Sequence, residues 1–409
     1  MPSATIDDKS DLIQRRTSPC VRTLHIEWAA DGTVGGSHQA LFDLVAGLDK
    51  NRFEPVVLFN QMNRFASSLM DLGIEVHDYG PVFEQEATLR RSAGRIAKGG
   101  AMAAAIRRRM RFLREHNIGL LHLNNSPSYG GMDWMPAAKL IGIPALSSIM
   151  EYQPYSASLP WRAIFRRFDR VLPVSRIVAD SWIAAGIPPE RVRVVHHGVD
   201  AQRVRARCTR EPGEVRVELG VPDGRLLVVM GGNVRHWKGQ HVVLEGLTRL
   251  SAEDQARLYI VFAGATSAED RDYYAGLQDY VEQNRLGAWV RFLGFRSDLP
   301  NLLRAADIVI HASIQVEPSG IVVLEAMTLG SAVVAADMGG HTEVMVEGTG
   351  LTFNTKDPQT LAQQVSALTA SAELRAQLGH AAVERVAEFS VERNVRRTES
   401  VYAELLRGR

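Results

Sequence analysis

Cysteine is scarce in this chain. Its 409 residues include only two cysteines, Cys20 and Cys208, which lie far apart and form no C-x-x-C pair. This argues against a disulfide-stapled domain and against a cysteine-based zinc site. A reducing cytosol is the simplest setting, so we expect a cytoplasmic protein.

Long apolar runs and a large net charge are missing as well. No apolar stretch approaches the roughly 20 residues that span a bilayer. Lysine plus arginine, 47, balances aspartate plus glutamate, 46, so no global field recruits nucleic acid and we expect no nucleic-acid partner. Residues 1–20 are polar and lack the apolar core of a signal peptide. We expect a disordered tail there.

Two familiar nucleotide-binding motifs are also absent. The chain carries neither G-x-G-x-x-G at a strand-to-helix turn nor the P-loop pattern. A dinucleotide-dependent dehydrogenase and a P-loop NTPase are therefore poorly supported.

Apolar runs of strand length alternate with helical patterns along both halves of the chain. Such alternation predicts βαβ units and parallel sheets, with ligands at the carboxyl ends of the strands. The length suits two domains. We expect a first domain over 21–200, a linker over 201–216, a second domain over 217–389 and a final helix over 390–409. The expected strands are 21–28, 56–59, 75–79, 120–123, 145–149, 171–174, 192–195, 226–230, 258–263, 290–293, 308–312 and 332–336.

One strand, loop and helix in the second half has the makings of an anion site. The apolar run Ile308–Ala312 leads into a loop with Glu317, and Gly320 opens a helical segment that holds Glu325. Free amides at a helix start attract an anion. The plain alternative is an ordinary buried turn flanked by two solvated glutamates.

Two glycine-rich turns could bring a ligand close to the backbone. MGGNVRHWKGQ, residues 230–240, carries Arg235 and Lys238, whose charges suit a phosphate. Gly35 and Gly36 precede an expected helix over 37–48 and would leave amides free. Solvated surface cations and a flexible turn are the respective alternatives.

Residues 87–114 break the charge balance, because they contain nine basic residues and no acidic one. An apolar stripe at helical spacing predicts a helix with one apolar and one cationic face; its members are Met102, Ile106, Met110 and Leu113. The helix either docks on the sheet with solvated arginines, or contacts an acidic acceptor or, peripherally, the anionic inner face of the plasma membrane.

Taken together, four motifs resemble a known family: GNVRHWKG, FLGFRSDLPNLLRAADIVIHAS, EPSGIVVLEAM and GGHTEVM. They resemble the donor domain of the retaining GT-B glycosyltransferases of glycosyltransferase family four, the group 1 glycosyltransferases. The resemblance implies an α/β, GT-B fold with two facing Rossmann-like parallel-sheet domains and a C-terminal helix that crosses back to the first domain.

The resemblance also implies a function. It predicts a metal-independent hexosyltransferase that moves a sugar, with retention, from a nucleoside-diphosphate-sugar to a glycan or lipid-linked acceptor in polysaccharide biosynthesis, with no cofactor required. Two alternatives stay open. One is a different GT-B activity such as a nucleotide-sugar epimerase, and the other is a catalytically silent GT-B protein that binds a glycan or a partner.

The family's site residues map onto this chain by position. Glu325 would accept from the ribose hydroxyls, and Glu317 would lie beside the transferred sugar. Their placement argues against a double displacement by two carboxylates. The expected catalytic residues are Lys238, Glu317 and His122. The expected donor-binding residues are Gly35, Gly36, Asn233, Arg235, Lys238, Phe295, Arg296, Ser319, Gly320, Ile321, Val322 and Glu325.

The chain departs from the family pattern in several places. Asn233 stands where the family commonly has arginine, and Arg235 is the nearest substitute. His197 replaces the asparagine of N-G-V-D. His122 is the expected strand histidine, with Asn124 and a purely structural histidine as alternatives. A D-x-D at residues 270–272 lacks the context of the metal-dependent GT-A enzymes, so we expect no metal there.

Overall fold

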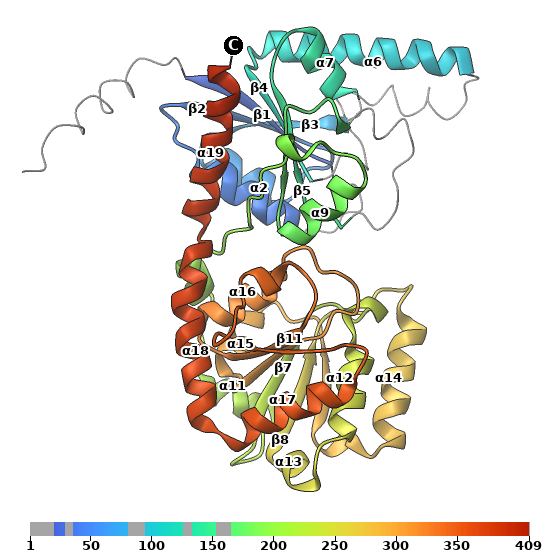
Figure 1. The fold of residues 1–409 in the computed structure, drawn as a ribbon, viewed down its shortest axis with the longest axis vertical. Helices are drawn as coiled ribbons and strands as arrows, with labels where there is room; N and C mark the ends of the chain where they lie inside the picture. Colours follow the sequence, from blue (N-terminus) through green and yellow to red (C-terminus); the bar gives the residue numbers. More distant parts are fainter. Residues whose placement is uncertain (1–19, 29–35, 81–94, 126–132, 153–164, 409) are drawn as a thin grey trace, which may run out of the picture. The chain divides into compact units, whose positions relative to one another are not determined.

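The computed structural model describes residues 20–28, 36–80, 95–125, 133–152 and 165–408. For residues 95–99 it describes the backbone alone. Gly35, the expected N-terminal tail up to residue 19 and residues 87–94 of the basic segment lie outside these ranges. The chain divides into two compact units (Figure 1). Unit 1 comprises Met1–Pro173, Trp182–Val195 and Val395–Arg409, and unit 2 comprises Val174–Ser181 and His196–Asn394.

Unit 1 is built on a six-stranded parallel sheet in the order β3-β2-β1-β4-β5-β6. Most of its strands are buried along nearly their whole length, as expected for a parallel sheet covered by helices on both faces. The strands are β1 Val21–Glu27, β2 Phe53–Phe59, β3 Glu75–Asp78, β4 Leu120–Asn124, β5 Ala145–Ile149 and β6 Arg170–Pro173. The helices are α2 Gly36–Gly47, α3 Arg64–Asp71, α6 Arg95–Glu115, α7 Trp134–Leu140 and α9 Arg176–Ala184, of which α9 is shared with unit 2.

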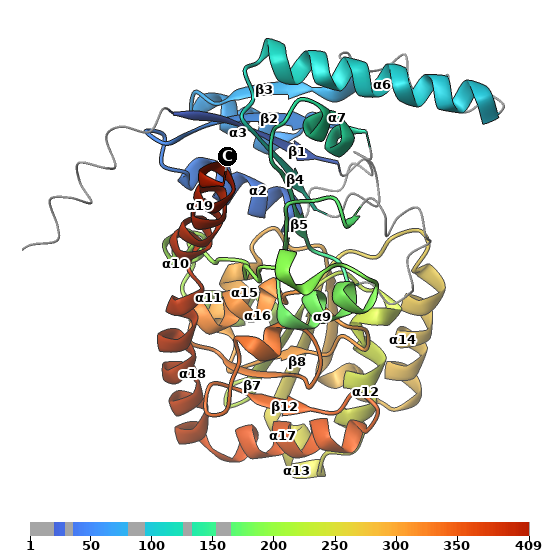
Figure 2. The ribbon, with the colours of Figure 1, turned by 45° about the horizontal axis from the view of Figure 1, so that its top comes forward.

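Unit 2 repeats this plan with the order β12-β11-β10-β7-β8-β9. Its helices lie on both sides of the sheet: α12 packs against α17, and α11 against α15 (Figure 2). The strands are β7 Leu226–Gly231, β8 Leu258–Ala263, β9 Val290–Gly294, β10 Ile308–His311, β11 Ala332–Ala336 and β12 Leu351–Phe353. The helices are α10 Ala201–Ala206, α11 Pro212–Leu219, α12 Gln240–Thr248, α13 Ala252–Arg257, α14 Arg271–Gln283, α15 Leu299–Ala305, α16 Ile321–Thr328, α17 Pro358–Ala370 and α18 Ala372–Val386.

The observed elements confirm eleven of the expected strands to within a few residues and differ from the sequence analysis at three places. The run at 192–195 is no strand, since only Val192 forms a bridge, to Val171. The short strand β12 was missed. Residues 201–216 carry α10 and most of α11, and Val204 and Val215 are buried in the core of unit 2.

Serine caps mark the last two helices as expected. Ser371 accepts a hydrogen bond from the Leu374 amide at 3.0 Å, and Ser390 accepts one from the Arg393 amide at 3.3 Å. The final helix, α19 Val391–Arg407, belongs to unit 1 from Val395 onward. There Glu399 accepts from the Asp49 amide at 2.7 Å. The C-terminal helix therefore serves the first unit, as the resemblance implied.

His122 lies in the middle of β4 and is fully buried. Its Nδ1 is 2.5 Å from the Tyr402 hydroxyl on α19, and its Nε2 is 2.8 Å from Ser148 Oγ on β5. Burial lowers the pKa of the ring to about 3, so the ring is neutral. These contacts favour the structural alternative for His122, a strand histidine that joins α19 to the sheet.

The basic helix α6 buries a different face from the one its sequence indicates. Leu113 is buried as expected, but Met102, Ile106 and Met110 are only partly buried. Arg109 is fully buried instead. Its Nη2 lies 2.9 Å from Asp133 Oδ2 and also bonds the Tyr79 hydroxyl. The buried face is completed by Ala105 and Phe112.

Within the described ranges, no helix combines the length and the apolar character that crossing a bilayer requires.

Replacing the buried arginine should destabilise unit 1. In Arg109→Met, the carboxylate of Asp133 keeps its buried position but loses the guanidinium, which should lower the free energy of unfolding by about 3–5 kcal/mol. Urea unfolding followed by circular dichroism measures the change. Arg111→Met is the matched control, because Arg111 is exposed on the same helix. Equal stability of the two variants would contradict the buried pair.

Candidate functional site

The loops after two neighbouring strands of unit 2 are fastened to each other. Strands β7 and β10 pair in parallel, so their carboxyl ends meet at one sheet edge. The Ile314 amide donates to the Trp237 carbonyl at 2.8 Å. Gly239 has φ +77°, and a Cβ there would lie 2.0 Å from the Ala312 oxygen, so only glycine permits this approach. The close contact brings Lys238 to the loop that carries Glu317.

Lys238 and Glu317 form an ion pair at this sheet edge. Lys238 Nζ lies 2.5 Å from Glu317 Oε2, and Ser313 Oγ donates to the same oxygen at 3.1 Å. Burial raises the pKa of the Glu317 carboxyl, but the nearby His311 ring and the Lys238 charge outweigh burial and hold this pKa well below its usual range. Glu317 is therefore ionised, and the pair places a cation and a carboxylate side by side.

The next helix, α16, starts beside this pair. Gly320 is its N-cap with φ +66°, and a Cβ there would lie 2.8 Å from His341 Cβ. The first helical bonds run from Val323 and Leu324 to the Gly320 carbonyl, so the amides of Ile321 and Val322 have no acceptor within the helix. Together with Lys238, these amides make a region that favours an anion.

Glu325 lies on α16 in the turn that follows these amides. Its side chain is 17% exposed, and Arg207 Nη1 lies 3.6 Å from Glu325 Oε1. Burial raises the pKa of the Glu325 carboxyl, while the charges of Arg207 and Arg203 oppose that rise. Both arginines come from α10 and its C-cap, so the segment expected as a linker supplies the cations that face Glu325.

Histidines that sequence reasoning gave no role surround the site. His197, which replaces the asparagine of N-G-V-D, places its Nδ1 3.0 Å from Ser319 Oγ. Burial, aided by His196, lowers the pKa of His197 to about 4. His341 Nε2 lies 2.8 Å from the Ala336 carbonyl oxygen, and its ring centroid is 4.6 Å from that of His311. Two sequence features could have pointed to these histidines. His311 ends the apolar strand β10, and His341 belongs to the GGHTEVM motif.

The remaining positions of the 230–240 turn are less enclosed. Asn233 is exposed, and its carbonyl accepts from Gln240 Nε2 at 3.0 Å. Arg235 Nε lies 3.7 Å from Asp270 Oδ2, and Ser267 Oγ donates to the same carboxylate at 2.5 Å. The first aspartate of the D-x-D is thus paired with Arg235 and a serine.

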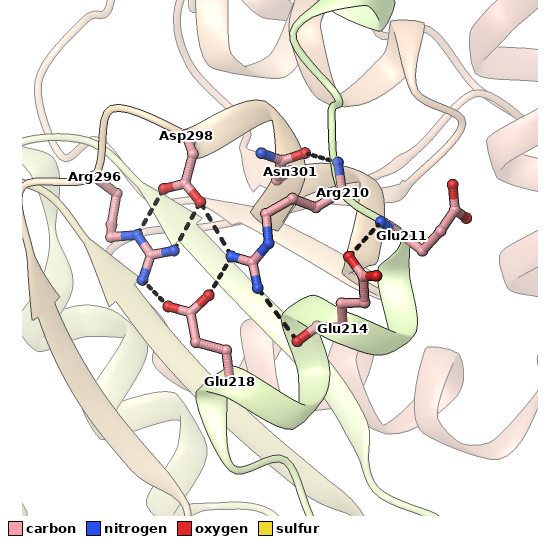
Figure 3. A network of polar contacts seen from close by, with 7 residues as sticks. All are labelled: Arg210, Glu211, Glu214, Glu218, Arg296, Asp298 and Asn301. Carbon is pink, nitrogen blue, oxygen red and sulfur yellow. Dashed lines mark hydrogen bonds and ion pairs between the residues drawn. The ribbon is translucent and has the colours of Figure 1, made fainter.

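Arg296 is held in a closed network of charges (Figure 3). Its guanidinium makes two bonds to Asp298, at 2.7 and 2.8 Å, and one to Glu218 Oε1 at 2.8 Å. Arg210 also bonds Glu218. The hydrogen bonds to Asp298 and Glu218 raise the Arg296 pKa above its usual value. The preceding residue, Phe295, is 73% exposed, so it presents a free aromatic face while Arg296 is tied to α11.

The expected site residues are divided between the two units. Lys238, Glu317 and the start of α16 lie together, with Ser319 in the same loop. His122 and Gly36 belong to unit 1. At the carboxyl end of β4, Asn124 Nδ2 donates to the Ser37 carbonyl at 3.2 Å and to the Glu27 carboxylate. Asn124 therefore lies at the end of the sheet where α2 begins, whereas His122 does not.

Comparisons with known proteins identify the family and the fold. The family model described as Glycosyl transferases group 1 matches residues 213–385, and the model described as Glycosyltransferase Family 4 matches residues 34–203. A D-inositol 3-phosphate glycosyltransferase of Saccharomonospora viridis is 29% identical over 272 residues, covering 64% of this chain and 62% of that protein. The chain thus matches less than two thirds of this relative's length.

Solved structures share the fold. The HepE protein of Anabaena in complex with UDP and glucose gives a TM-score of 0.74 at 22% identity, covering 94% of this chain and 100% of that one. A glycosyltransferase of Rickettsia africae gives 0.80 at 18% identity, covering 95% and 99%. These likenesses confirm the GT-B fold class, and the two family models account for most of the chain between them. The chain therefore belongs to the group 1 glycosyltransferases of glycosyltransferase family four.

Proposed function

We propose that this protein transfers a sugar from a nucleoside-diphosphate-sugar to an acceptor hydroxyl on a polysaccharide or lipid-linked glycan. The observation that carries the proposal is the Lys238–Glu317 pair beside the start of α16. A helix start and a lysine suit a diphosphate, and an ionised carboxylate next to them suits sugar hydroxyls. In this proposal unit 2 takes the donor and unit 1 takes the acceptor.

The chemistry that this site supports is stabilisation of the leaving nucleoside diphosphate. Negative charge grows on the diphosphate as the sugar leaves, and fixed amides and a fixed cation stabilise that charge without reorganising. Ile321, Val322 and Lys238 would fill this role, with no metal required and with departure and attack on one face of the sugar. Lys238 would exchange its bond to Glu317 for one to the phosphate. Glu317 would then accept from a sugar hydroxyl.

The nucleoside would extend away from the diphosphate. Glu325 would accept from the two ribose hydroxyls, since a carboxylate has two oxygens to offer. Phe295, which is exposed, would face the base, while Arg296 would fix the loop through Asp298 and Glu218. Uridine nucleotides are the first to test, because the structural neighbour HepE is described with UDP and glucose.

The reaction is tested by identifying donor and product. In a thermal-shift panel of UDP, GDP and ADP, one nucleotide at 100 times its dissociation constant should add about 2.7 kcal/mol of stability. With the matching sugar donor, proton NMR should show that the product keeps the anomeric configuration of the donor. Adding EDTA should leave the transfer rate unaltered at temperatures at which the protein stays folded. Free or isomerised sugar formed without acceptor would favour an epimerase. Binding of no nucleotide would favour a silent protein.

Lys238 can be tested separately from the rest of the site. Lys238→Ala should lower kcat by about 10²–10³-fold and weaken UDP binding by about 10–100-fold, the worth of a hydrogen bond to a charged group. UMP binding should change little, because we place Lys238 on the outer phosphate. Isothermal titration with both nucleotides measures the difference. Lys356→Ala, an exposed lysine of unit 2, is the control, and equal losses for UDP and UMP would contradict the assignment.

We also propose that α6 contacts anionic lipid, since Arg107, Arg111 and Arg114 are exposed on it. At about 1 kcal/mol per arginine, replacing these three by serine should weaken binding to phosphatidylserine vesicles about 100-fold in low-salt co-sedimentation. A control with equal loss of charge replaces three exposed arginines on other helices, Arg257, Arg271 and Arg397. Absence of binding by the unaltered protein would refute the contact.

A further inference from the structure

Two histidines and a glutamate converge at the edge of the sheet in unit 1. Glu75 and His77 are alternate residues of the edge strand β3, so they share one face. His116 directly follows α6. Glu75 Oε1 lies 2.7 Å from His77 Nε2 and 2.9 Å from His116 Nδ1. Among the described residues, these three are the group of metal-ligand types whose ligand atoms all lie within 4.8 Å of one another.

We propose that Glu75, His77 and His116 bind one divalent transition-metal ion of the zinc type. Imidazole and carboxylate are ligands that zinc takes in tetrahedral sites, and bonds of about 2.0–2.1 Å place neighbouring ligand atoms about 3.3 Å apart. The two nitrogens already lie within 3 Å of one carboxylate oxygen. To admit the ion, each nitrogen would move a few tenths of an ångström away from this oxygen, through small ring rotations.

The surroundings hold these three side chains in place. Arg22 on β1 pairs with Glu75 Oε2, donates to the His116 carbonyl at 2.6 Å, and lies 3.2 Å from Glu54 Oε1. Phe112 stacks on the His116 ring at 4.2 Å and meets the His77 ring edge-on at 5.4 Å. Outer contacts of this kind orient metal ligands and strengthen binding. Arg22 therefore orients both the carboxylate and the residue at the end of α6.

Charge and exposure also suit a cation. Arg22 pairs with both Glu75 and Glu54, so one cation faces two carboxylates here. The formal charges of Glu54, Glu75 and Arg22 sum to −1. The side chains of His77, His116 and Glu75 are 24%, 26% and 37% exposed, so water can complete the coordination sphere.

A bound ion would join the end of α6 to β3 and so strengthen the attachment of the basic helix to the sheet. This role is structural and breaks no covalent bond. It does not depend on the proposed transfer reaction, and its test measures metal binding without any sugar substrate.

The test uses the full chain without an affinity tag, after removal of metal with a chelator. Titration with Zn²⁺ should show one equivalent bound and a rise in Tm, and Co²⁺ should give the strong visible absorption of a tetrahedral complex. His77→Gln and His116→Gln should each weaken Zn²⁺ binding by at least about tenfold. Loss of a residue that merely orients a ligand already costs about 10–100-fold in affinity, and loss of the ligand itself should cost no less. Both variants keep the Arg22–Glu75 pair.

His380→Gln is the matched control, because His380 also lies near a glutamate but belongs to unit 2. Its side chain is 81% exposed, and its Nε2 is 3.5 Å from Glu384 Oε1. It should bind Zn²⁺ like the unaltered protein. The Tm of each metal-free variant confirms that it folds. The proposal is overturned if the protein binds no saturable equivalent of Zn²⁺, or if the three variants bind it equally well.

Discussion

The close approach of Gly239 to the Ala312 carbonyl is the constraint on which the proposed site depends. A side chain at Gly239 would collide with that oxygen at 2.0 Å. With glycine there, the loops after β7 and β10 share a backbone hydrogen bond, and Lys238 reaches Glu317. Parallel pairing of the two strands puts both loops at one sheet edge. The site is therefore a consequence of backbone packing before any side chain is considered.

Charge is distributed over this site so that each group has an opposing partner. Lys238 offsets the burial of Glu317, and Arg207 opposes the burial of Glu325. Arg296 is paired with Asp298 and Glu218. In our proposal a diphosphate replaces Glu317 as the partner of Lys238. Such an exchange of partners costs less than burying an unpaired phosphate.

Much of the fold could be predicted from the sequence, because parallel strands buried on both faces read as continuous apolar runs. The prediction of a strand at 192–195 was wrong. An apolar segment that forms a single bridge has the same sequence pattern as a strand that pairs along its whole length. β12 has only three residues and no such run. The buried face of α6 could not be foreseen, because Arg109 is buried through its pairing with Asp133, 24 positions away.

The candidate site, too, could be predicted only in part from the sequence. Motif order placed Lys238, Glu317 and Gly320 in one region, and the structure brings them together. The tie between His197 and Ser319 spans 122 residues, and the network around Arg296 reaches back to Glu218. Neither has a local pattern in the sequence. His122 has a strand pattern but lies in the core against Tyr402, which depends on how the final helix packs.

The most direct test of this account is a crystal structure with the nucleoside diphosphate that binds most tightly. We expect the phosphate oxygens within hydrogen-bond distance of the Ile321 and Val322 amides and of Lys238 Nζ, with both ribose hydroxyls on Glu325. A nucleotide bound elsewhere, or one that leaves Lys238 on Glu317 and makes no contact with Glu325, would contradict it.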